Sequence, residues 1–367
     1  MKVGIYIDQM SRRGGAQRVV SNLCHGWTNR GWEVHLVVLR EDAAAFPVPA
    51  AVSRHCLSDH DKRQGLAGFW DNWRNMKRLG AVVRREKLDA VLSVSTVANI
   101  HLAFADIPAR TVRVGSEHSY LPHFPLPCYK EWIRRAAYRR LDALVCPTKA
   151  AASYLRKAYP GARPQGIANW LTWPLPKGDG LTDIGLGRPG RRTFIACGRF
   201  DKLKGFSRLI VMFAALKERL HDWDLVIVGD GEDRALLEAQ VRETKLCDRV
   251  FFPGWAADME SIFRSGDLFL FPSVSEGFAL VLAEAMACGL PCVSYDCKVG
   301  PSEIIQDGHD GVLVPVGDEA AFSAAMLRLA EGHAARRTLA ANGPSILERL
   351  SEEAIQPLWA KVLSTKR

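Results

Sequence analysis

The sequence predicts an α/β protein built from two doubly wound domains, each with a parallel β-sheet between layers of helices. Short apolar runs alternate with stretches of helical periodicity, which is typical of β-α-β units. The alternation stops in a segment rich in Pro, Gly and Trp and then starts again. The 367 residues therefore divide into two domains, which we expect to face each other across a cleft.

The elements follow from the pattern in chain order. The expected strands of the first half are 2–8, 33–39, 88–94, 111–115 and 143–147, and the helices between them are 16–30, 65–87, 129–141 and 148–158. A break without periodicity covers 159–192. The expected strands of the second half are 193–197, 224–229, 250–252, 267–271, 291–295 and 311–314, with helices at 205–219, 232–246, 279–288 and 318–331. These ranges give an N-terminal domain over 1–170, a linker over 171–192 and a C-terminal domain over 193–350. A C-terminal helix over 351–367 follows, and packing back onto the first domain is one option for it.

The composition is that of a globular protein, with 48% hydrophobic and 24% charged residues, which excludes disordered and fibrous chains. No run approaches the ~18 apolar residues of a membrane span. The first residues alternate like a strand and do not resemble a cleavable signal. The nine cysteines show no spacing typical of a zinc site or a disulfide framework. We therefore expect a cytoplasmic protein.

Positive charge is concentrated in the first half of the chain. Residues 1–180 hold 27 Lys and Arg against 14 Asp and Glu, and seven of the ten Trp. Two helical stretches combine both kinds of residue: Trp70, Trp73, Arg74, Lys77, Arg78, Arg84, Arg85 and Lys87 on one, and Lys130, Trp132, Arg134, Arg135, Arg139 and Arg140 on the other. This pattern predicts peripheral binding to an anionic membrane surface, at the inner leaflet of the plasma membrane. A solvated basic face and nucleic-acid binding are the alternatives, although no nucleic-acid motif accompanies the charge.

Two glycine-containing loops follow expected strands. Gly14 and Gly15 lie between the strand 2–8 and its helix, where glycine lets backbone amides approach a phosphate. Their spacing is not the dinucleotide-binding fingerprint, and a plain tight turn is the alternative. The second loop, 198–205, begins with Gly198 and holds Arg199 and Lys204, two cations that could clamp a diphosphate at the carboxyl end of a strand.

The most specific signal is the segment 272–291. Glu276 and Gly277 lie in a loop after a strand, and Glu284 follows on a helix among apolar residues. A buried carboxylate needs partners, and two ribose hydroxyls would serve. The backbone amides of Phe278, Ala279 and Leu280 at the helix start could bind phosphate.

Here the chain resembles the family-four glycosyltransferases (GT4), retaining enzymes of the GT-B fold that use nucleotide sugars. Their hallmark Glu-x7-Glu is matched by Glu276 and Glu284, and the flanking segments 266–273 and 303–311 also match the family's sequence pattern. The resemblance covers nearly the whole chain and is strongest over 193–315. It implies two doubly wound, Rossmann-like domains.

The resemblance also implies roles for single residues. Glu276 would contact the donor sugar, Glu284 would bind ribose, and Arg199 and Lys204 would neutralise the diphosphate. His118, after the strand 111–115, resembles the family's first-domain histidine near the transferred sugar. The expected catalytic residues are His118, Glu276, Arg199 and Lys204.

The remaining expected donor-binding residues are Gly14, Gly15, Gly198, Gly229, Gly254, Trp255, Gly277, Phe278, Ala279, Leu280 and Glu284. Base choice is expected near Gly254 and Trp255. The family's Pro-Asn-Pro or Pro-Asn-Gly is replaced around Asn169 by Ile-Ala-Asn-Trp, so the sequence assigns that residue no role.

We expect no metal and no cofactor. The leaving nucleoside diphosphate is a stable anion, so the transition state mainly needs positive charge, which Arg199, Lys204 and helix-terminal amides could supply. The strings Asp59-His60-Asp61 and Asp222-Trp223-Asp224 could in principle hold Mg²⁺, but they lie away from the strand ends where a pocket is expected.

The resemblance implies a hexose or N-acetylhexosamine transferase with a UDP-sugar as the expected donor. The expected acceptor is a lipid-linked or glycolipid molecule in bacterial-type surface polysaccharide or lipopolysaccharide assembly. The N-terminal domain is expected on the acceptor side, and the C-terminal domain is expected to bind the nucleotide sugar. A nucleotide-sugar epimerase on the same fold and a basic module that binds nucleic acid or membrane are the alternatives.

Overall fold

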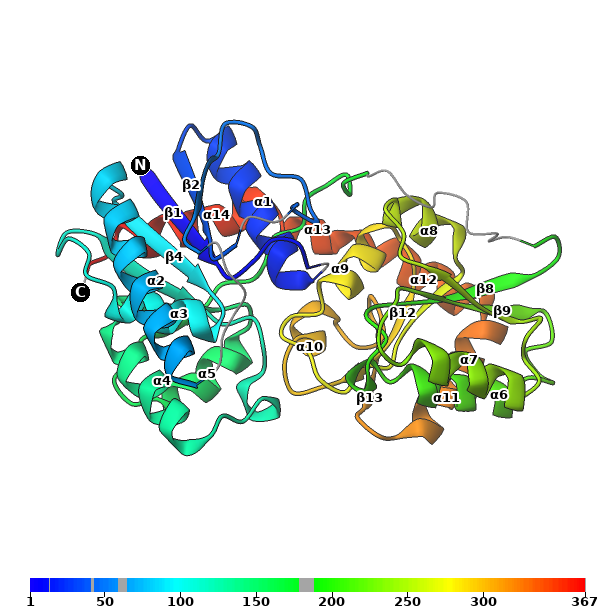
Figure 1. The fold of residues 1–367 in the computed structure, drawn as a ribbon. Coiled ribbons are helices and arrows are strands. Elements are labelled where there is room, and N and C mark those ends of the chain that lie inside the picture. Colours follow the sequence, from blue (N-terminus) through cyan, green and yellow to red (C-terminus); the bar gives the residue numbers. More distant parts are fainter. Residues whose placement is uncertain (13, 41–42, 59–64, 178–187, 367) are drawn as a thin grey trace. The chain divides into compact units, whose positions relative to one another are not determined.

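The computed structural model describes residues 1–12, 14–40, 43–58, 65–177 and 188–366, which form two compact units (Figure 1). The first unit consists of Met1–Trp170 and Glu352–Arg367, and the second of Leu171–Ser351. Each unit contains one sheet of parallel strands with helices packed against it. The predicted fold class, two doubly wound Rossmann-like α/β domains, is therefore confirmed.

The sheet of the first unit has the strand order β3-β2-β1-β4-β5-β6-β7. Its strands are β1 (Lys2–Ile7), β2 (Glu33–Val38), β3 (Ser53–Cys56), β4 (Ala90–Val94), β5 (Val112–Ser116), β6 (Ala143–Cys146) and β7 (Pro164–Gly166). The central strands β1 and β4 pair from Val3 with Ala90 to Ile7 with Val94, and these four residues are buried. Because both faces of the sheet are covered, the central strands read as continuous apolar runs.

The helices of the first unit are α1 (Gly15–Asn29), α2 (Gly65–Glu86), α3 (Thr96–Phe104), α4 (Cys128–Arg140), α5 (Lys149–Ala158) and α14 (Glu352–Ser364), with a short 3₁₀ helix η1 (Leu121–His123). Helix α3 packs against both α2 and α4, and the three lie side by side (Figure 1). Each of them leads from one parallel strand to the next. Their N-termini therefore all lie at the carboxyl edge of the sheet.

The last helix of the chain, α14, packs within the first unit. The Trp27 indole N–H donates a hydrogen bond to Gln356 Oε1 at 2.9 Å, and the Trp359 ring meets Trp27 edge-on with centroids 6.0 Å apart. All three side chains are buried. The chain thus returns to its first unit to complete that unit's core.

The sheet of the second unit has the strand order β10-β9-β8-β11-β12-β13. Its strands are β8 (Arg192–Cys197), β9 (Trp223–Val228), β10 (Val250–Gly254), β11 (Leu268–Phe271), β12 (Cys292–Asp296) and β13 (Val312–Pro315). The order reverses between β8 and β11, which are neighbours in the sheet. At such a switch point the loops after the two strands diverge and leave room for a ligand.

The second unit has the α-helices α6 (Phe206–Ala215), α7 (Arg234–Glu243), α8 (Met259–Ser265), α9 (Leu280–Ala287), α10 (Pro301–Ile304), α11 (Glu319–Glu331), α12 (His333–Asn342) and α13 (Ile346–Arg349), and the 3₁₀ helices η2 (Lys202–Lys204) and η3 (Gly343–Ser345). Its core is rich in aromatic residues. Phe194 on β8 and Trp223 on β9 are stacked with ring centroids 4.1 Å apart.

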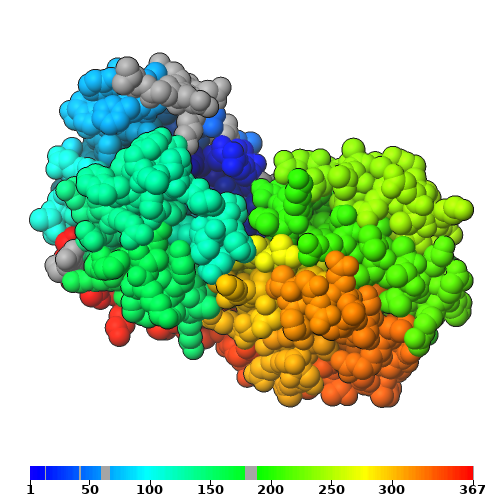
Figure 2. All heavy atoms as spheres, turned by 90° about the horizontal axis from the view of Figure 1, so that it is seen from below, coloured from blue at the N-terminus to red at the C-terminus, as the bar shows by residue number. Residues whose placement is uncertain are grey.

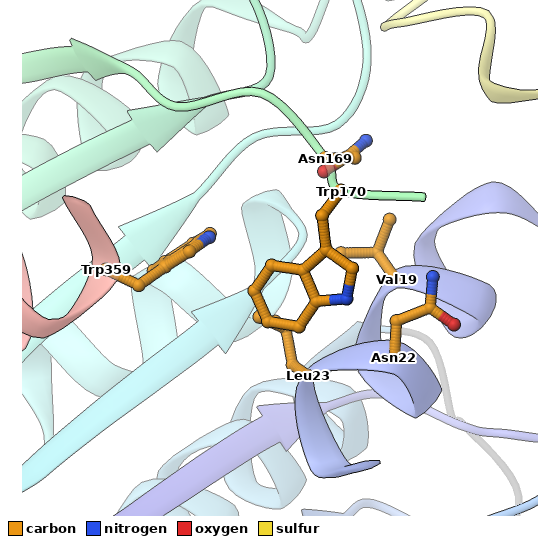
Figure 3. A pocket seen from close by; sticks show the side chains of 6 residues that line it. All are labelled: Val19, Asn22, Leu23, Asn169, Trp170 and Trp359. Carbon is orange, nitrogen blue, oxygen red and sulfur yellow. The ribbon is translucent and has the colours of Figure 1, made fainter. Parts of the chain in front are cut away.

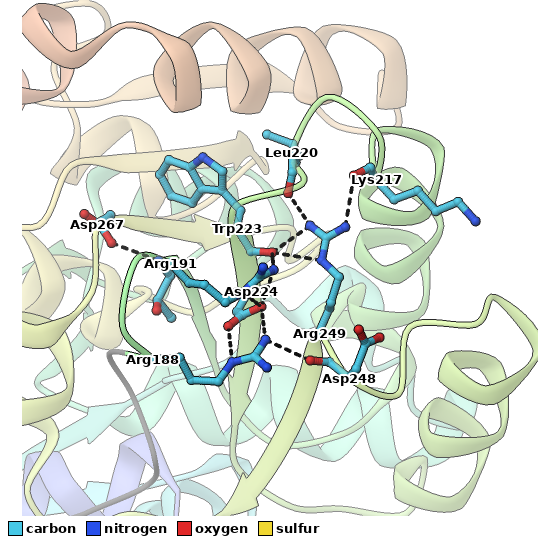
Figure 4. A network of polar contacts seen from close by, with 10 residues as sticks. Arg188, Arg191, Lys217, Leu220, Trp223, Asp224, Asp248, Arg249 and Asp267 are labelled. Atoms are coloured by element: carbon cyan, nitrogen blue, oxygen red, sulfur yellow. Dashed lines mark hydrogen bonds and ion pairs between the residues drawn. The ribbon is translucent and has the colours of Figure 1, made fainter.

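A network of arginines closes the amino edge of the second sheet (Figure 4). The buried carboxylate of Asp224, near the start of β9, accepts hydrogen bonds from Arg188 at 2.6 and 2.8 Å and from Arg191 at 2.8 Å. Arg249 donates to the carbonyl of Trp223 at 2.6 Å. The residues just before β8 are thereby fixed to the sheet.

The chain crosses between the units after Trp170 and again after Ser351. Just inside the second unit, the Leu171 N–H donates to the Leu350 carbonyl at 2.8 Å, so the two ends of that unit are adjacent. Just inside the first unit, Trp170 lines a small cavity with Val19, Asn22, Leu23, Asn169 and Trp359 (Figure 3). Asn169 is buried there, against α1 and α14.

Some elements escaped the sequence pattern. Strand β7 lies within the break expected at 159–192, and β3 is a short edge strand with a polar sequence. Edge strands need no apolar run, because only part of each is covered. Helix α3 was missed because its residues are apolar on most sides, which hides the helical period.

Candidate functional site

The loops that follow the strands of the second unit gather at one edge, because all its strands are parallel. The predicted residues Gly198, Gly229 and Gly254 lie at the ends of β8, β9 and β10. The segment 272–279 follows β11, next to β8 at the switch point. The structure therefore places the predicted donor-binding residues of this unit on a single edge.

The loop after β8 positions Arg199 through Asp201. Arg199 Nε donates to Asp201 Oδ2 at 2.8 Å, while Asp201 Oδ1 accepts the Leu203 N–H at 3.0 Å and caps η2. The Arg199 side chain is 72% exposed. Asp201 was missed as a site residue, although its position two residues after Arg199 was a usable signal.

Lys204 and Glu276 form an ion pair across the switch point. The Lys204 Nζ lies 2.6 Å from Glu276 Oε1, and the two side chains are 21% and 10% exposed. A backbone bond from Val274 N–H to the Leu203 carbonyl at 2.9 Å holds the two loops together. The ammonium and the carboxylate of the predicted pocket are thus in direct contact.

Gly205 explains why the two loops approach so closely. Its φ is +71°, and a Cβ at this position would lie 2.2 Å from the Pro272 carbonyl oxygen. Gly229 is also required to be glycine, because a Cβ there would lie 1.9 Å from the carbonyl oxygen of Gly198. Glycine at these positions lets the ends of β8, β9 and β11 pack backbone against backbone.

Helix α9 begins directly behind Glu276 and Gly277. Ala279 adopts the left-handed conformation, with φ +71°, as the residue before the first helical residue Leu280. Phe278 is buried. The first amides of a helix lack partners within it, so the start of α9 can receive an anion.

Glu284 lies on the buried side of α9. It is only 2% exposed, as its apolar neighbours in the sequence predict. Trp255, after β10, is partly buried and follows Gly254, whose carbonyl accepts the Gly229 N–H at 2.8 Å. The predicted base region and the loop after β9 are therefore joined by a backbone hydrogen bond.

In the first unit, His118 follows β5 at the carboxyl edge. Its Nε2 forms a hydrogen bond with Ser116 Oγ at 2.8 Å. Burial lowers the pKa of His118 to about 4. The imidazole is therefore neutral at neutral pH, and it can exchange hydrogen bonds but adds no positive charge.

The neighbouring Glu117 is a buried carboxyl group that the sequence analysis missed, although it adjoins His118. It accepts hydrogen bonds from Thr96 at 2.8 Å, from Asn99 at 2.9 Å and from the Tyr138 hydroxyl. Burial raises the pKa of Glu117, while these donors act in the opposite direction. The network fixes the backbone from which His118 projects.

Gly14 and Gly15 form the start of α1, directly after the β1 loop. Gly14 is the N-terminal cap residue in an extended conformation, and its N–H donates to the Arg12 carbonyl at 3.1 Å. A Cβ at Gly15 would have no described neighbour within 4 Å. This end of α1 has the geometry of a glycine loop before a helix, as predicted.

The two aspartate strings differ in what the structure says of them. Asp59-His60-Asp61 lies outside the described residues. Asp224 is at the amino edge of the second sheet, opposite the predicted pocket, and arginines occupy its carboxylate. Among the described residues, no group of three or more His, Cys, Asp or Glu is arranged to hold a metal ion.

The basic stretch on α4 keeps exposed cations in Lys130, Arg135, Arg139 and Arg140, but Arg134 is not part of that face. Arg134 is buried and pairs with Glu131, while Arg135 and Arg139 donate to backbone carbonyls at 2.7 and 3.0 Å. The Arg140 guanidinium lies over a phenylalanine ring, 4.6 Å from its centroid. The prediction is wrong for Arg134, because its side chain is buried and its guanidinium is paired within the first unit.

No helix in the described ranges has the length and apolar character needed to cross a membrane.

Comparison with known proteins gives a consistent picture. Residues 191–332 match the family model for glycosyl transferases group 1, and residues 13–169 match the model for glycosyltransferase family 4. The lipopolysaccharide core biosynthesis glycosyltransferase LpsD of Rhizobium meliloti is 28% identical over 345 residues, which cover 93% of this chain and 92% of LpsD. The amylovoran biosynthesis glycosyltransferase AmsD of Erwinia amylovora is 25% identical over 366 residues, 99% of each chain.

Among solved structures, HepE of Anabaena in complex with UDP-glucose superposes with a TM-score of 0.81 and 21% identity, covering 99% of both chains. This likeness concerns the fold of the whole chain.

Proposed function

The chain belongs to glycosyltransferase family 4 and has the GT-B fold, and we propose that it transfers a hexose or N-acetylhexosamine from a UDP-sugar. We propose a lipid-linked or glycolipid acceptor in surface polysaccharide or lipopolysaccharide assembly. The biosynthetic names of LpsD and AmsD support this class of acceptor, and the UDP-glucose complex of HepE supports the donor.

The observation that carries the proposal is the Lys204–Glu276 ion pair at the switch point. A nucleotide-sugar site must hold a diphosphate beside a sugar. Lys204 and Arg199 are suited to the phosphates, and the Glu276 carboxylate is suited to accept hydrogen bonds from sugar hydroxyls. Glu284, behind the start of α9, is proposed for the ribose.

In the proposed reaction, the bond between the anomeric carbon and the diphosphate oxygen breaks, and the nucleoside diphosphate leaves. An acceptor oxygen forms the new bond on the same face, and its proton passes to a diphosphate oxygen, so configuration is retained. Arg199, Lys204 and the amides at the start of α9 stabilise the developing negative charge, with no metal. His118 acts as a neutral hydrogen-bonding group for the sugar.

The test is a donor screen. Thermal unfolding with UDP, GDP and ADP should give stabilisation by UDP, because a ligand that binds only the folded state raises its stability. Incubation with UDP-sugars and a bacterial lipid extract, followed by mass spectrometry, should then show one lipid gaining one hexose or N-acetylhexosamine. Stabilisation by RNA alone, or release of an epimerised nucleotide sugar without acceptor, would contradict the proposal.

A further inference from the structure

The exposed aromatic side chains of this protein are concentrated on two segments of the first unit. Among the residues that the structure describes, seven aromatic side chains stand exposed, and all but Trp173 belong to the first part of α2 or to the segment from η1 into α4. These six are Phe69, Trp70, Trp73, Phe124, Tyr129 and Trp132, which we call the aromatic edge. Their exposed fractions run from 40% for Trp73 to 72% for Trp132.

The two segments lie at the same end of the first unit. Helices α2 and α4 both begin at the carboxyl edge of the sheet, on either side of α3. Phe69, Trp70 and Trp73 lie in the first half of α2. Phe124 precedes α4, and Tyr129 and Trp132 lie in the first half of that helix. Figure 2 also shows the surfaces of α2 (light blue) and α4 (green-cyan) next to each other. The aromatic edge therefore lies toward the carboxyl edge of the sheet, where His118 is also found.

The three residues of the aromatic edge that lie on α2 contact one another. Phe69 and Trp70 meet edge-on with centroids 6.0 Å apart, and Trp70 and Trp73 do the same at 5.8 Å. The Lys77 ammonium lies 3.8 Å from the centroid of Trp73, and the Lys130 ammonium lies 5.8 Å from that of Tyr129. Large amphipathic rings beside lysine ammonium groups match the interface of a bilayer that contains anionic lipid.

We propose that the aromatic edge inserts into the interfacial layer of an anionic membrane and so holds the carboxyl edge of the first unit against the lipid. The inference rests on the proposed function for its purpose, since a lipid-linked acceptor would then reach the enzyme from the membrane. It differs from attachment through basic helix faces, because aromatic rings rather than arginine charges supply most of the binding. Insertion of rings depends on apolar area and survives salt, whereas attraction between charges is screened within ~8 Å at physiological ionic strength.

The test uses the full chain and vesicles of phosphatidylcholine with or without phosphatidylglycerol, at low and high salt. The wild type should float with the anionic vesicles and stay bound at high salt, with its tryptophans quenched by brominated lipid. The double variant Trp70→Ser/Trp73→Ser should bind about tenfold more weakly at both salt concentrations, because two exposed rings are lost. Trp173→Ser, an exposed tryptophan of the second unit, is the matched control and should bind as the wild type does.

Each other outcome has a defined meaning. Complete release by salt, with equal binding of wild type and double variant, would overturn insertion in favour of simple charge attraction. Light scattering without lipid that shows a wild-type dimer and a monomeric double variant would assign the aromatic edge to a second copy instead. UDP-induced stabilisation is measured on every variant. If UDP stabilises the wild type and no vesicle binds, the membrane inference fails while the proposed function stands. If UDP does not stabilise the wild type, the proposed function itself fails.

Discussion

Lys204 and Glu276 are 72 residues apart in the chain, yet the ammonium of one lies 2.6 Å from the carboxylate of the other. The Glu276 carboxylate is therefore paired with the same ammonium group that a diphosphate would need. A donor that binds here must share this ammonium or take it over.

From this contact we predict that Glu276→Gln binds UDP more tightly than the wild type while its transfer rate falls. Removing the carboxylate frees Lys204 for the diphosphate, and a partly buried pair of this kind is worth enough to change affinity by about threefold to tenfold. Isothermal titration with UDP, which has no sugar, measures the effect. Glu243→Gln, on the exposed surface of α7, is the control and should leave affinity unchanged. Weaker UDP binding in Glu276→Gln would mean that the carboxylate only positions the lysine.

The phosphate clamp gives a second prediction. Arg199→Ala and Lys204→Ala should each lower kcat/KM by an amount equal to ~2–4 kcal/mol of transition-state stabilisation, the scale of one lost electrostatic contact. Steady-state kinetics with the donor found in the screen will measure it. Lys202→Ala changes an exposed cation of the same loop and should retain activity. Near-normal turnover in both single variants would remove the clamp from the mechanism.

Metal removal is the third test. With cations already facing the leaving group, we expect activity to survive incubation with EDTA and gel filtration. A loss that Mg²⁺ or Mn²⁺ restores would show that a divalent ion supplies part of the charge.

The fourth prediction concerns pH. Burial lowers the pKa of His118 from 6.5 to about 4. As the pH falls through this range, the unfolded chain takes up the proton first, so the folded state loses stability between about pH 6.5 and 4, by up to about 3 kcal/mol. In urea unfolding at about pH 7.5 and pH 5, His118→Asn should lose less stability than the wild type. His333→Asn, which removes an exposed imidazole, should keep the wild-type loss. Equal losses in all three proteins would contradict the assignment.

The fifth prediction isolates the close approach at Gly205. Gly205→Ala and Gly308→Ala both place alanine at a φ above +70°, but only at Gly205 does the new Cβ meet a carbonyl oxygen. Gly308→Ala should lower the free energy of unfolding by about 1–2 kcal/mol. Gly205→Ala should lower it further and weaken UDP binding, since it pushes the loop after β8 away from Pro272. Equal effects of the two variants on unfolding and on UDP binding would show that the loop after β8 moves enough to accommodate the new Cβ without further cost.

The sequence predicts features that leave a local pattern, and it does not predict contacts between elements that are distant in the chain. The periodicity predicted the central strands and the long helices, because burial on both faces leaves a direct pattern in β1 and β4. It also predicted the positions of Arg199, Lys204 and Glu276 at strand ends. It could not predict that Lys204 and Glu276 touch, since this depends on the neighbour relation of β8 and β11, which no local pattern contains. Nor could it predict the buried Arg134, because an arginine whose charge is paired inside the protein looks the same in the sequence as one in solvent.

The hydrogen bond between Leu171 and Leu350 has a consequence for how such a protein can be rearranged. The second unit is one continuous stretch of chain inserted between Trp170 and Glu352, and its two ends are neighbours. A gene segment cut at these two points encodes a complete cassette, which we expect to fold by itself and to bind nucleotide. The same two cuts define where a cassette from another member of the family can be spliced in. Because we propose that the second unit binds the donor, we expect this exchange to change donor preference while the first unit stays the same.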